Sequence, residues 1–392
     1  MRKLSLLDMD LKGKRVLVRV DFNVPLNDKG QITDDFRIRC SVPTVEHIVK
    51  QGGKAILMAH LGRPKGRDPK CSLKPVAERL QQLMNRPVKF VSDCIGPEAQ
   101  AAVAALKPGE ILMLENVRFY PEEEKNDEAF ARKLAALGDV YVNDGFAVSH
   151  RAQASVVGVA KFLPSAAGLV VGREIAHLGA LLGNPEKPYV AIFGGAKVSD
   201  KIPITRNLIG KLDRIIIGGG MCYTFLKAQG VSIGSSKLEA EMVETARQIL
   251  EEAAAKGVQV FLPVDHVVAT ELSDTAQTKI VEGNIPDGYM GLDIGPKTVA
   301  AFKKALADAK TVVWNGPLGV FEKKPFRSGT KEIAEALAAL EATVVVGGGD
   351  TAAAVALFGV GDRLTHVSTG GGASVEFLEG KELPGLAILP DK

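Results

Sequence analysis

The sequence predicts an α/β fold with two doubly wound, mainly parallel-sheet (Rossmann-like) domains joined by a linker helix. Short Val/Ile/Leu runs alternate with longer helical patterns along the whole chain, which is typical of parallel sheets with helical crossovers. The runs are continuously apolar, as expected for strands that are buried on both faces. The pattern restarts in the second half, after a long amphipathic stretch. These observations predict two domains of the same class.

Residues 1–167 are expected to form the N-terminal domain. Its predicted strands are Val16–Val20, Ala55–Ala59, Ile111–Leu114 and Val140–Val142. Its predicted helices are Arg37–Gln51, Leu73–Asn85, Glu98–Leu106 and Ala129–Leu137.

The amphipathic stretch Gly168–Gly183 is the predicted linker helix. Asn184-Pro185 ends it, because proline cannot continue a helix. The hinge is therefore assigned to residues 168–184 and the C-terminal domain to residues 185–376. The clearest helix of that domain is Glu239–Lys256. Its predicted strands are Tyr189–Phe193, Ile215–Ile217, Val258–Leu262, Val312–Trp314 and Val344–Val346.

Composition argues against several classes of protein. The 392 residues are 46% hydrophobic and 24% charged with a net charge of +3, which indicates neither a disordered chain nor a nucleic-acid or membrane-surface binder. The four cysteines are scattered singly, which fits no zinc site or disulfide framework and suits a reducing cytoplasm. Asp8 and Asp10 interrupt the N-terminus, so no signal peptide is expected. Uncharged runs such as Ile215–Leu226 are too short to span a membrane.

Gly-rich turns follow several strands of the second half. Glycine lets a phosphate approach the backbone, and ligands of open α/β sheets bind at the carboxyl ends of strands. A tight turn alone explains any single cluster, but four clusters in one domain favour a nucleotide. The clusters are Gly194-Gly195-Ala196-Lys197, Gly218-Gly219-Gly220, Gly347-Gly348-Gly349-Asp350-Thr351 and Gly370-Gly371-Gly372-Ala373-Ser374.

Common signatures of other enzymes are missing. The sequence has no GxxxxGK followed by Ser or Thr, no GxGxxG after the first strand, and no protein-kinase HRD or DFG motif. It also has no HExxH, and no Ser or Cys has a convincing His partner for nucleophilic catalysis.

Polar and basic residues follow the strands of the first half. Several Arg side chains and one His at successive strand ends should converge on one site, and Arg matches the geometry of carboxylate and phosphate. The predicted ligand is therefore a small, multiply anionic molecule. His60 alone is weak evidence, and the acidic run Glu122–Glu124 is expected to be an exposed, solvated loop. The residues of this predicted site are Asp21, Asn23, Arg37, His60, Arg63, Arg118 and Arg151.

Several blocks of the sequence resemble the phosphoglycerate kinase family, in the same order and essentially end to end. They are Arg19-Val20-Asp21-Phe22-Asn23-Val24-Pro25, His60-Leu61-Gly62-Arg63-Pro64, Leu114-Glu115-Asn116-Val117-Arg118-Phe119, Gly194–Lys201, Trp314-Asn315-Gly316-Pro317 and Gly347–Thr351. The chain departs slightly from the family pattern at Gly145, where alanine is more usual, and at Arg327-Ser328.

The resemblance implies reversible transfer of a phosphoryl group from 1,3-bisphosphoglycerate to ADP, giving 3-phosphoglycerate and ATP with Mg²⁺. It implies in-line transfer in a closed interdomain cleft, with phosphoglycerate on the N-terminal domain and nucleotide on the C-terminal domain. Residues 377–392 would pack back onto the N-terminal domain. A cytoplasmic monomer with no nucleic-acid or membrane partner is expected.

The resemblance also implies roles for individual residues. Arg37, Lys201 and the backbone of Gly371, Gly372 and Ala373 would assist transfer; the last position is alanine, although the role was expected of a glycine. Asp350 would carry Mg²⁺. The implied substrate-binding residues are Asp21, Phe22, Asn23, Arg37, His60, Leu61, Gly62, Arg63, Arg118 and Arg151. The implied nucleotide-binding residues are Gly195, Lys197, Lys201, Gly219, Gly220, Gly291, Leu292, Asn315, Pro317, Val320, Glu322, Gly348, Gly349, Asp350 and Thr351.

The implied chemistry agrees with the absence of a convincing catalytic base. The acceptor of the ATP-consuming direction is a carboxylate with a pKa near ~3.5, so it is already ionised. Two alternatives remain open at this point. A nicotinamide-dependent dehydrogenase would need a dinucleotide fingerprint and a catalytic His or Lys. A non-catalytic phosphometabolite sensor would be expected to lose Lys201, Asp350 or Arg37, and all three are present.

Overall fold

A computed structural model describes residues 2–392, and the chain forms two compact units. Unit 1 contains the chain up to Ala176 together with Glu382–Lys392, and unit 2 contains His177–Lys381. The division lies within helix α5 (Leu169–Leu182), which confirms the long helix predicted over Gly168–Gly183. Each unit is built on a six-stranded parallel sheet flanked by helices, so the predicted fold class is also confirmed.

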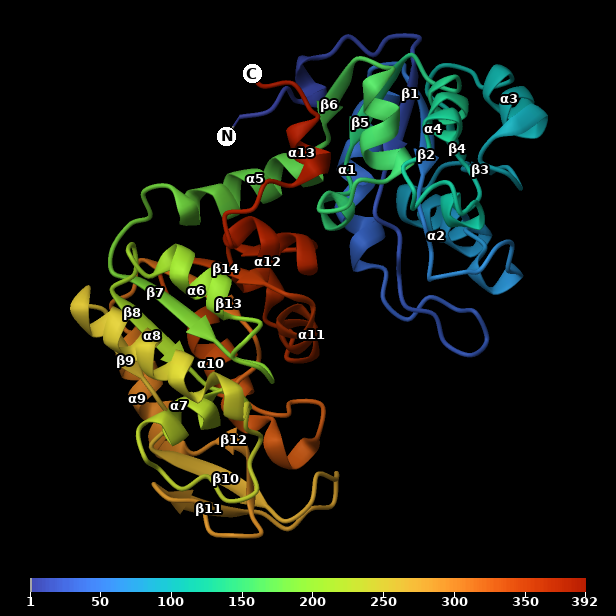
Figure 1. The fold of residues 1–392 in the computed structure, drawn as a ribbon. Helices are drawn as coiled ribbons and strands as arrows, with labels where there is room; N and C mark the ends of the chain where they lie inside the picture. Colours follow the sequence, from blue (N-terminus) through green and yellow to red (C-terminus); the bar gives the residue numbers. More distant parts are fainter. Residues whose placement is uncertain (1) are drawn as a thin grey trace. The chain divides into compact units, whose positions relative to one another are not determined.

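Unit 1 is built on one sheet of six strands. The strands are β1 (Arg15–Arg19), β2 (Lys54–Met58), β3 (Lys89–Phe90), β4 (Ile111–Met113), β5 (Val140–Asn143) and β6 (Ser165–Ala167). The helices are α1 (Phe36–Lys50), α2 (Lys74–Met84), α3 (Gly96–Ala104), α4 (Glu128–Ala135) and the short α13 (Pro384–Ala387). The strand order is β3-β4-β2-β1-β5-β6 and every pair is parallel (Figure 1). The two short strands β3 and β6 lie outside the predicted set.

The register of this sheet brings the ends of its central strands together. Arg19, the last residue of β1, pairs with Met58 of β2 and with Asn143 of β5. The segments that follow these strands therefore leave from the same edge. Apolar side chains such as Val18 and Leu57 form the buried core beneath that edge.

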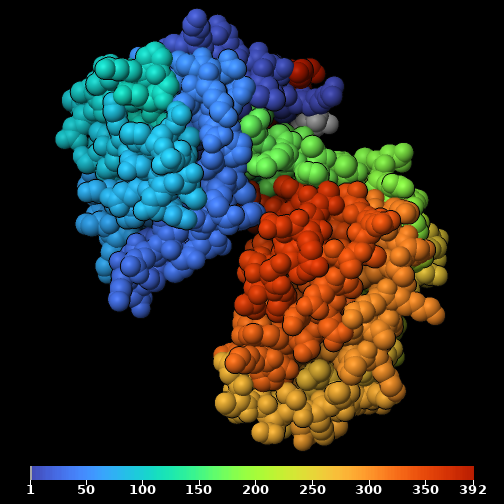
Figure 2. Space-filling view, turned by 180° about the vertical axis from the view of Figure 1, so that it is seen from behind, coloured from blue at the N-terminus to red at the C-terminus, as the bar shows by residue number. Residues whose placement is uncertain are grey.

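The C-terminal segment of the chain belongs to unit 1. The Gly385 N–H donates to the Ser149 carbonyl oxygen at 2.8 Å, and Leu4 N–H donates to the Pro390 carbonyl oxygen at 2.8 Å. The Lys3 ammonium pairs with Asp391 at 2.7 Å. Figures 1 and 2 both show this segment, in red, beside the dark blue N-terminal residues. The C-terminal residues Glu382–Lys392 therefore pack against the N-terminal residues within unit 1.

Unit 2 contains a second six-stranded sheet and a smaller one. The strands are β7 (Tyr189–Phe193), β8 (Arg214–Ile217), β9 (Gln259–Phe261), β10 (Asp265–Ala269), β11 (Lys279–Glu282), β12 (Met290–Ile294), β13 (Thr311–Asn315), β14 (Thr343–Gly347) and β15 (His366–Val367). The helices are α6 (Ile202–Leu208), α7 (Cys222–Ala228), α8 (Val243–Ala255), α9 (Pro296–Leu306), α10 (Ser328–Ala338), α11 (Gly349–Leu357) and α12 (Gly372–Leu378). The large sheet is parallel, in the order β15-β14-β13-β7-β8-β9.

The small sheet was not among the sequence predictions. It is antiparallel, in the order β11-β10-β12 (Figure 1). Its edge strand β11 is mostly exposed, and Ile280 is 58% exposed. Such a strand lacks the continuous apolar run that marks a doubly buried parallel strand, which explains why the pattern did not reveal it.

The register of the large sheet aligns three of the Gly-rich turns. Asn315 of β13 pairs with Phe193 of β7 and with Gly347 of β14. Phe193 in turn pairs with Ile217 of β8. The Gly-rich turns after these strands therefore lie along one edge, above a core that includes the buried Trp314. In the described part of the chain, no helix is long and apolar enough to cross a membrane.

Candidate active site

The edge of unit 1 carries a cluster of polar side chains from four segments. Arg37, on the first turn of α1, donates from Nη1 to the Asp21 carboxylate at 2.5 Å. The Gly62 N–H donates to the Asn23 side-chain oxygen at 2.9 Å. Arg118 Nη1 donates to the Gly62 carbonyl oxygen at 3.0 Å. The structure therefore brings together residues that the sequence places after β1, β2 and β4.

A buried chain of hydrogen bonds holds His60 in this cluster. Arg19 Nη2 lies 3.0 Å from His60 Nδ1, and Arg19 Nε donates to Ser155 Oγ at 2.8 Å. Ser155 Oγ donates to Glu123 Oε1 at 2.5 Å, and Ser155 N–H donates to Glu123 Oε2 at 2.9 Å. A guanidinium has no acceptor, so Nδ1 of His60 accepts and Nε2 carries the proton.

Electrostatics keep His60 uncharged. Burial, together with the charges of Arg19, Arg118, Arg37 and Arg151, lowers the pKa of His60 well below its ordinary value. The four arginines also place several positive charges near the ring, which favours an anionic ligand. A neutral His60 supplies one N–H donor within that positive field.

The structure corrects the sequence prediction for the acidic run Glu122–Glu124. Glu123 is fully buried, although Glu122–Glu124 was expected to be a solvated loop. Burial raises the pKa of Glu123, while Arg19 and the hydrogen bonds from Ser155 act in the opposite direction. Glu123, Ser155 and Arg19 were not among the predicted site residues. Of these three, only Arg19 could have been noticed in the sequence, because it is a charged residue at the end of an apolar run and the first residue of a motif block.

The other predicted residues of unit 1 fall into two groups. Arg63 and Arg151 are exposed. The side chains of Phe22 and Leu61 are buried in the hydrophobic core. Asn116 ties this region together, since its Nδ2 donates to the carbonyl oxygens of Leu61 at 2.8 Å and Cys71 at 2.9 Å.

In unit 2, the turns after β7 and β13 touch through their backbones. Gly194 N–H donates to the Asn315 carbonyl oxygen at 3.0 Å, and Gly195 N–H donates to the Pro317 carbonyl oxygen at 2.9 Å. A Cβ added to Gly194 would lie 2.2 Å from the Pro317 oxygen, and one added to Gly316 would lie 2.1 Å from the Gly194 oxygen. Glycine is therefore required for this close approach. It occurs where the strand order reverses, which is the usual place for a ligand in open α/β sheets.

Lys201 and Asn315 form the polar centre of this edge. Lys201 Nζ donates to the Asn315 side-chain oxygen, and Asn315 Nδ2 is buried without a hydrogen-bond partner. A Cβ on Gly348 would lie 3.3 Å from that nitrogen. Burial lowers the pKa of Lys201, while Asp200, Asp350 and Glu379 act in the opposite direction. An unused amide donor beside a lysine and a glycine turn is a suitable setting for a phosphate oxygen.

Several of the implied nucleotide-binding residues are joined by backbone hydrogen bonds. Val320 N–H donates to the Leu292 carbonyl oxygen at 2.9 Å, and Gly219 N–H donates to the Leu318 carbonyl oxygen at 3.0 Å. Gly291 N–H donates to Ser236 Oγ at 2.9 Å. These contacts link the turns after β8 and β13 with strand β12.

The remaining predicted nucleotide residues lie around the same turns. Thr351 is buried, and its hydroxyl accepts from Gly316 N–H at 2.7 Å. Gly349 and Asp350 lie in the first turn of α11 and are exposed. Gly220 is half-buried, and Lys197 and Glu322 are exposed. Gly372 and Ala373 begin α12, and Gly371 precedes it with φ +50°.

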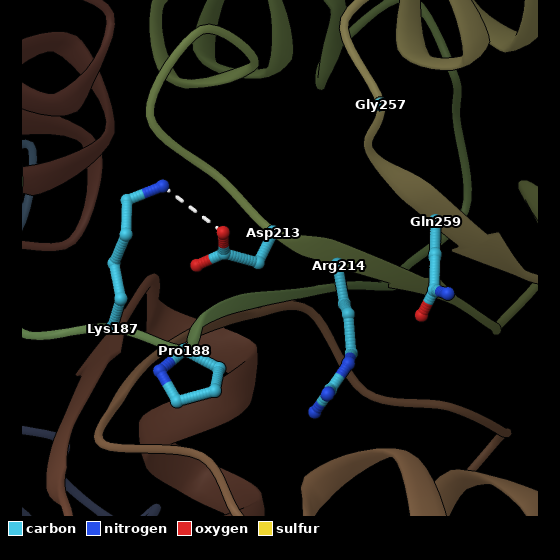
Figure 3. A pocket seen from close by; sticks show the side chains of 6 residues that line it. All are labelled: Lys187, Pro188, Asp213, Arg214, Gly257 and Gln259. Carbon is cyan, nitrogen blue, oxygen red and sulfur yellow. Dashed lines mark hydrogen bonds and ion pairs between the residues drawn. The ribbon is translucent and has the colours of Figure 1, made fainter.

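A separate concavity lies at the opposite edge of the same sheet. Its volume is about 390 Å³, and Figure 3 shows Lys187, Asp213 and Arg214 on its wall. Its residues lie at the starts of β7, β8 and β9, whereas the glycine turns follow strand ends. Lys187 pairs with Asp213 at 3.0 Å, and Arg214 pairs with Asp308 at 2.5 Å. Its charges are already neutralised, so this concavity is not assigned to the substrates.

Few carboxylates at this edge are available to hold a metal ion. Within residues 2–392, no three His, Cys, Asp or Glu side chains gather as a metal site. Mg²⁺ commonly uses one or two carboxylates and completes its shell with water and substrate phosphates. Asp350 is one exposed carboxylate close enough to Lys201 to affect its pKa. The residues present therefore fit a Mg²⁺ ion carried largely by a nucleotide.

Comparison with known proteins agrees with this geometry. The sequence model of the family described as "Phosphoglycerate kinase" matches residues 6–381. The chain belongs to the phosphoglycerate kinase family. A phosphoglycerate kinase from Moorella thermoacetica is 56% identical over 394 residues, which cover 100% of both chains. One from Anaeromyxobacter dehalogenans is 55% identical over 96% of this chain and 97% of its own.

Solved structures of phosphoglycerate kinases share the fold. The enzyme from Coxiella burnetii has a TM-score of 0.88 at 42% identity, and that from Pyrococcus horikoshii has a TM-score of 0.87 at 32% identity. Both comparisons cover 98% of each chain. Family membership confirms the predicted enzyme class, a phosphotransferase with a carboxyl group as acceptor and a nucleotide as co-substrate. The comparisons give no support to the alternative of a non-catalytic sensor.

Proposed function

We propose that the chain catalyses phosphoglycerate kinase chemistry with its two substrates bound to different units. Unit 1 binds 3-phosphoglycerate or 1,3-bisphosphoglycerate, and unit 2 binds ATP or ADP. The observation that carries this assignment is the presence of two unlike clusters at the carboxyl ends of two parallel sheets. One is rich in arginine around a neutral His60, and the other is built from glycine turns around Lys201.

The cluster of unit 1 suits a small molecule with a phosphate and a carboxylate. Asp21 and Asn23 accept hydrogen bonds from hydroxyl groups of the glycerate. His60, Arg63, Arg118 and Arg151 bind its phosphate by charge and hydrogen bonding, with His60 donating from Nε2. The backbones of Phe22, Leu61 and Gly62 shape the floor of this site.

The cluster of unit 2 suits a nucleotide. The adenine packs among Gly195, Gly219, Gly220, Gly291, Leu292, Pro317 and Val320, and Glu322 accepts from the ribose hydroxyls. Lys197, Lys201, Asn315 and Thr351 contact phosphates, with the turn at Gly348 and Gly349. The unpartnered Asn315 Nδ2 supports a phosphate acceptor at this place. Asp350 would hold Mg²⁺, which neutralises phosphate charge when bound.

Transfer then requires positioning and charge rather than a base. The accepting carboxylate is ionised at neutral pH, and His60 is held neutral, with Nδ1 accepting from Arg19 and Nε2 left as a donor. We propose that Arg37, Lys201 and backbone N–H groups at 371–373 stabilise the charge of an in-line transition state. Arg37 and Lys201 belong to different units, and we propose that a closing motion about α5 lets both act on one phosphoryl group. We further propose a cytoplasmic monomer.

The test pairs a coupled assay with binding measurements. Wild-type protein should form ATP from 1,3-bisphosphoglycerate and ADP in a Mg²⁺-dependent reaction. By calorimetry, His60→Gln should weaken the binding of 3-phosphoglycerate and leave the binding of ADP unchanged. Leu292→Ala should weaken the binding of ADP and leave the binding of 3-phosphoglycerate unchanged. No ATP formation would refute the activity. Weaker ADP binding by His60→Gln, or weaker 3-phosphoglycerate binding by Leu292→Ala, would refute the assignment of substrates to units.

A further inference from the structure

Asp293 lies at the end of β12 and is only 2% exposed. Its Oδ2 accepts from Gly329 N–H at 2.8 Å, in the first turn of α10. Its Oδ1 accepts from Ile294 N–H at 2.9 Å. One buried carboxyl group therefore joins the small sheet to the start of a helix.

The same carboxyl group also touches the loop between β13 and α10. A Cβ added to Gly319 would lie 2.2 Å from Asp293 Oδ1, and one added to Gly329 would lie 2.4 Å from it. Asp293 thus fills space that only glycine leaves open. The loop is tied on either side of Gly319, by Val320 N–H to the Leu292 carbonyl oxygen at 2.9 Å and by Leu318 N–H to Thr330 Oγ1 at 3.1 Å.

The ionised charge of Asp293 does not explain its presence. Burial raises the pKa of Asp293 to about 8, so folding disfavours its ionised form. What the residue contributes is two backbone hydrogen bonds and a close fit against glycine. Leu292 precedes Asp293 in the sequence and is bonded to Val320, and both are residues of the proposed nucleotide site.

We propose that Asp293 is a positioning residue for nucleotide binding, which holds Leu292 and the loop 316–322 in the arrangement that receives adenine and ribose. The inference rests on the proposed nucleotide site and deepens it, because Asp293 acts through the loop without touching the ligand. Thr330 assists by holding Leu318, and Gly319 supplies the space for the carboxyl group.

The chain offers a matched control in Asp265. That residue is also a buried carboxylate of the small sheet, with 1% exposure at the start of β10. It accepts from Thr298 N–H at 2.8 Å and Lys297 N–H at 3.0 Å, in the first turn of α9. It therefore performs the same local task at a helix that carries none of the proposed nucleotide residues.

The experiment measures ADP and 3-phosphoglycerate dissociation constants at pH 7 for Asp293→Asn, Asp265→Asn and Leu292→Ala. An asparagine side chain has one oxygen fewer than a carboxyl group. In Asp293→Asn, either Gly329 N–H or Ile294 N–H therefore faces the amide NH₂ group and loses its acceptor. For Asp293→Asn we expect ADP binding to weaken about tenfold, with 3-phosphoglycerate binding within about twofold of wild type. Asp265→Asn should change neither constant.

A second pair of variants guards against misfolding. Gly319→Ala pushes a methyl group against Asp293 and should weaken ADP in the same way, whereas Gly210→Ala enters open space and should not. If Leu292→Ala weakens ADP binding but Asp293→Asn and Gly319→Ala do not, the positioning role is refuted while the proposed nucleotide site is supported. If Asp265→Asn weakens ADP binding as much as Asp293→Asn does, loss of any buried carboxyl group of the small sheet has this effect, and the specific positioning role of Asp293 is refuted. If Leu292→Ala also leaves ADP unchanged, the pocket itself is wrong and the inference fails with it.

Discussion

Asp144 provides a test of buried charge in unit 1. Its carboxylate Oδ1 accepts from Val170 N–H at 2.9 Å at the start of α5 and from Thr44 Oγ1 at 2.9 Å. Burial raises the pKa of Asp144 from 3.8 to about 7, against the opposing effects of these hydrogen bonds, Ser41 and Arg173. The folded state therefore holds a proton that the unfolded chain releases.

The sign and size of the effect follow from this shift. Between pH 3.8 and about 7 the folded chain binds more protons than the unfolded chain at this site, so stability falls as pH rises. At about 1.4 kcal/mol for each pKa unit, the contribution lost between pH 5 and pH 8 is roughly 2.5 kcal/mol. Asp144→Asn does not titrate, so all other groups cancel when the two proteins are compared.

The assay is urea unfolding of wild type and Asp144→Asn at pH 5, 6.5 and 8. The single tryptophan, Trp314, lies in unit 2, so unfolding of unit 1 must be followed by hydrogen exchange of amides in β1 and β5. Tryptophan fluorescence then serves as the control for unit 2. Wild type should lose roughly 2.5 kcal/mol relative to the variant from pH 5 to pH 8. A constant difference, or a wild type that gains stability with pH, would refute the reasoning.

Three further predictions concern catalysis. Arg37→Ala should lower kcat by about 10²–10³ because one transition-state charge contact is lost, with ADP affinity unchanged by calorimetry; unchanged kcat would contradict the role. Asp350→Asn should raise the Mg²⁺ concentration for half-maximal rate by roughly 10–100-fold, and a wild-type Mg²⁺ titration would remove Asp350 from the metal site. Small-angle scattering should show compaction with 3-phosphoglycerate plus Mg-nucleotide, less with either alone, and a weaker contrast in Ala176→Pro, which interrupts α5. Identical scattering of free and ternary forms would exclude closure.

The sequence predicted those parts of the fold in which one pattern dominates. The strand Tyr189–Phe193 is reproduced to the residue because it is apolar throughout and buried on both faces. Strand β11 was missed because its side chains are mostly exposed and mixed in character. Strands β3 and β6 are too short to show a period. Prediction therefore failed where local pattern is weak and pairing is decided by distant residues.

The candidate site divides in the same way. Residues in the motif blocks, such as Asp21 and Lys201, could be named because the order of the blocks along the chain is distinctive. Glu123 could not, since a run of three acidic residues ordinarily lies in solvent and only the fold reveals that Ser155 and Arg19 close over it. Asp293 is a similar case, because its partners Gly319 and Gly329 are distant in sequence.

The largest upward carboxyl shifts of this protein lie in supporting positions rather than at the proposed chemistry. Asp144 and Asp293 have raised pKa values because each is enclosed where a helix begins. Perturbed groups often mark catalytic acids and bases, and here that rule would select residues outside the proposed site. The reason is chemical: phosphoryl transfer to a carboxylate asks for fixed positive charge and close placement, not for a proton acceptor near neutral pH. His60 follows the same logic, since burial and the surrounding arginines lower its pKa well below the ordinary value and favour the neutral ring, which donates from one N–H. The strongly raised carboxyl pKa values of Asp144 and Asp293 therefore belong to residues that would support the proposed sites rather than to residues that would contact the substrates.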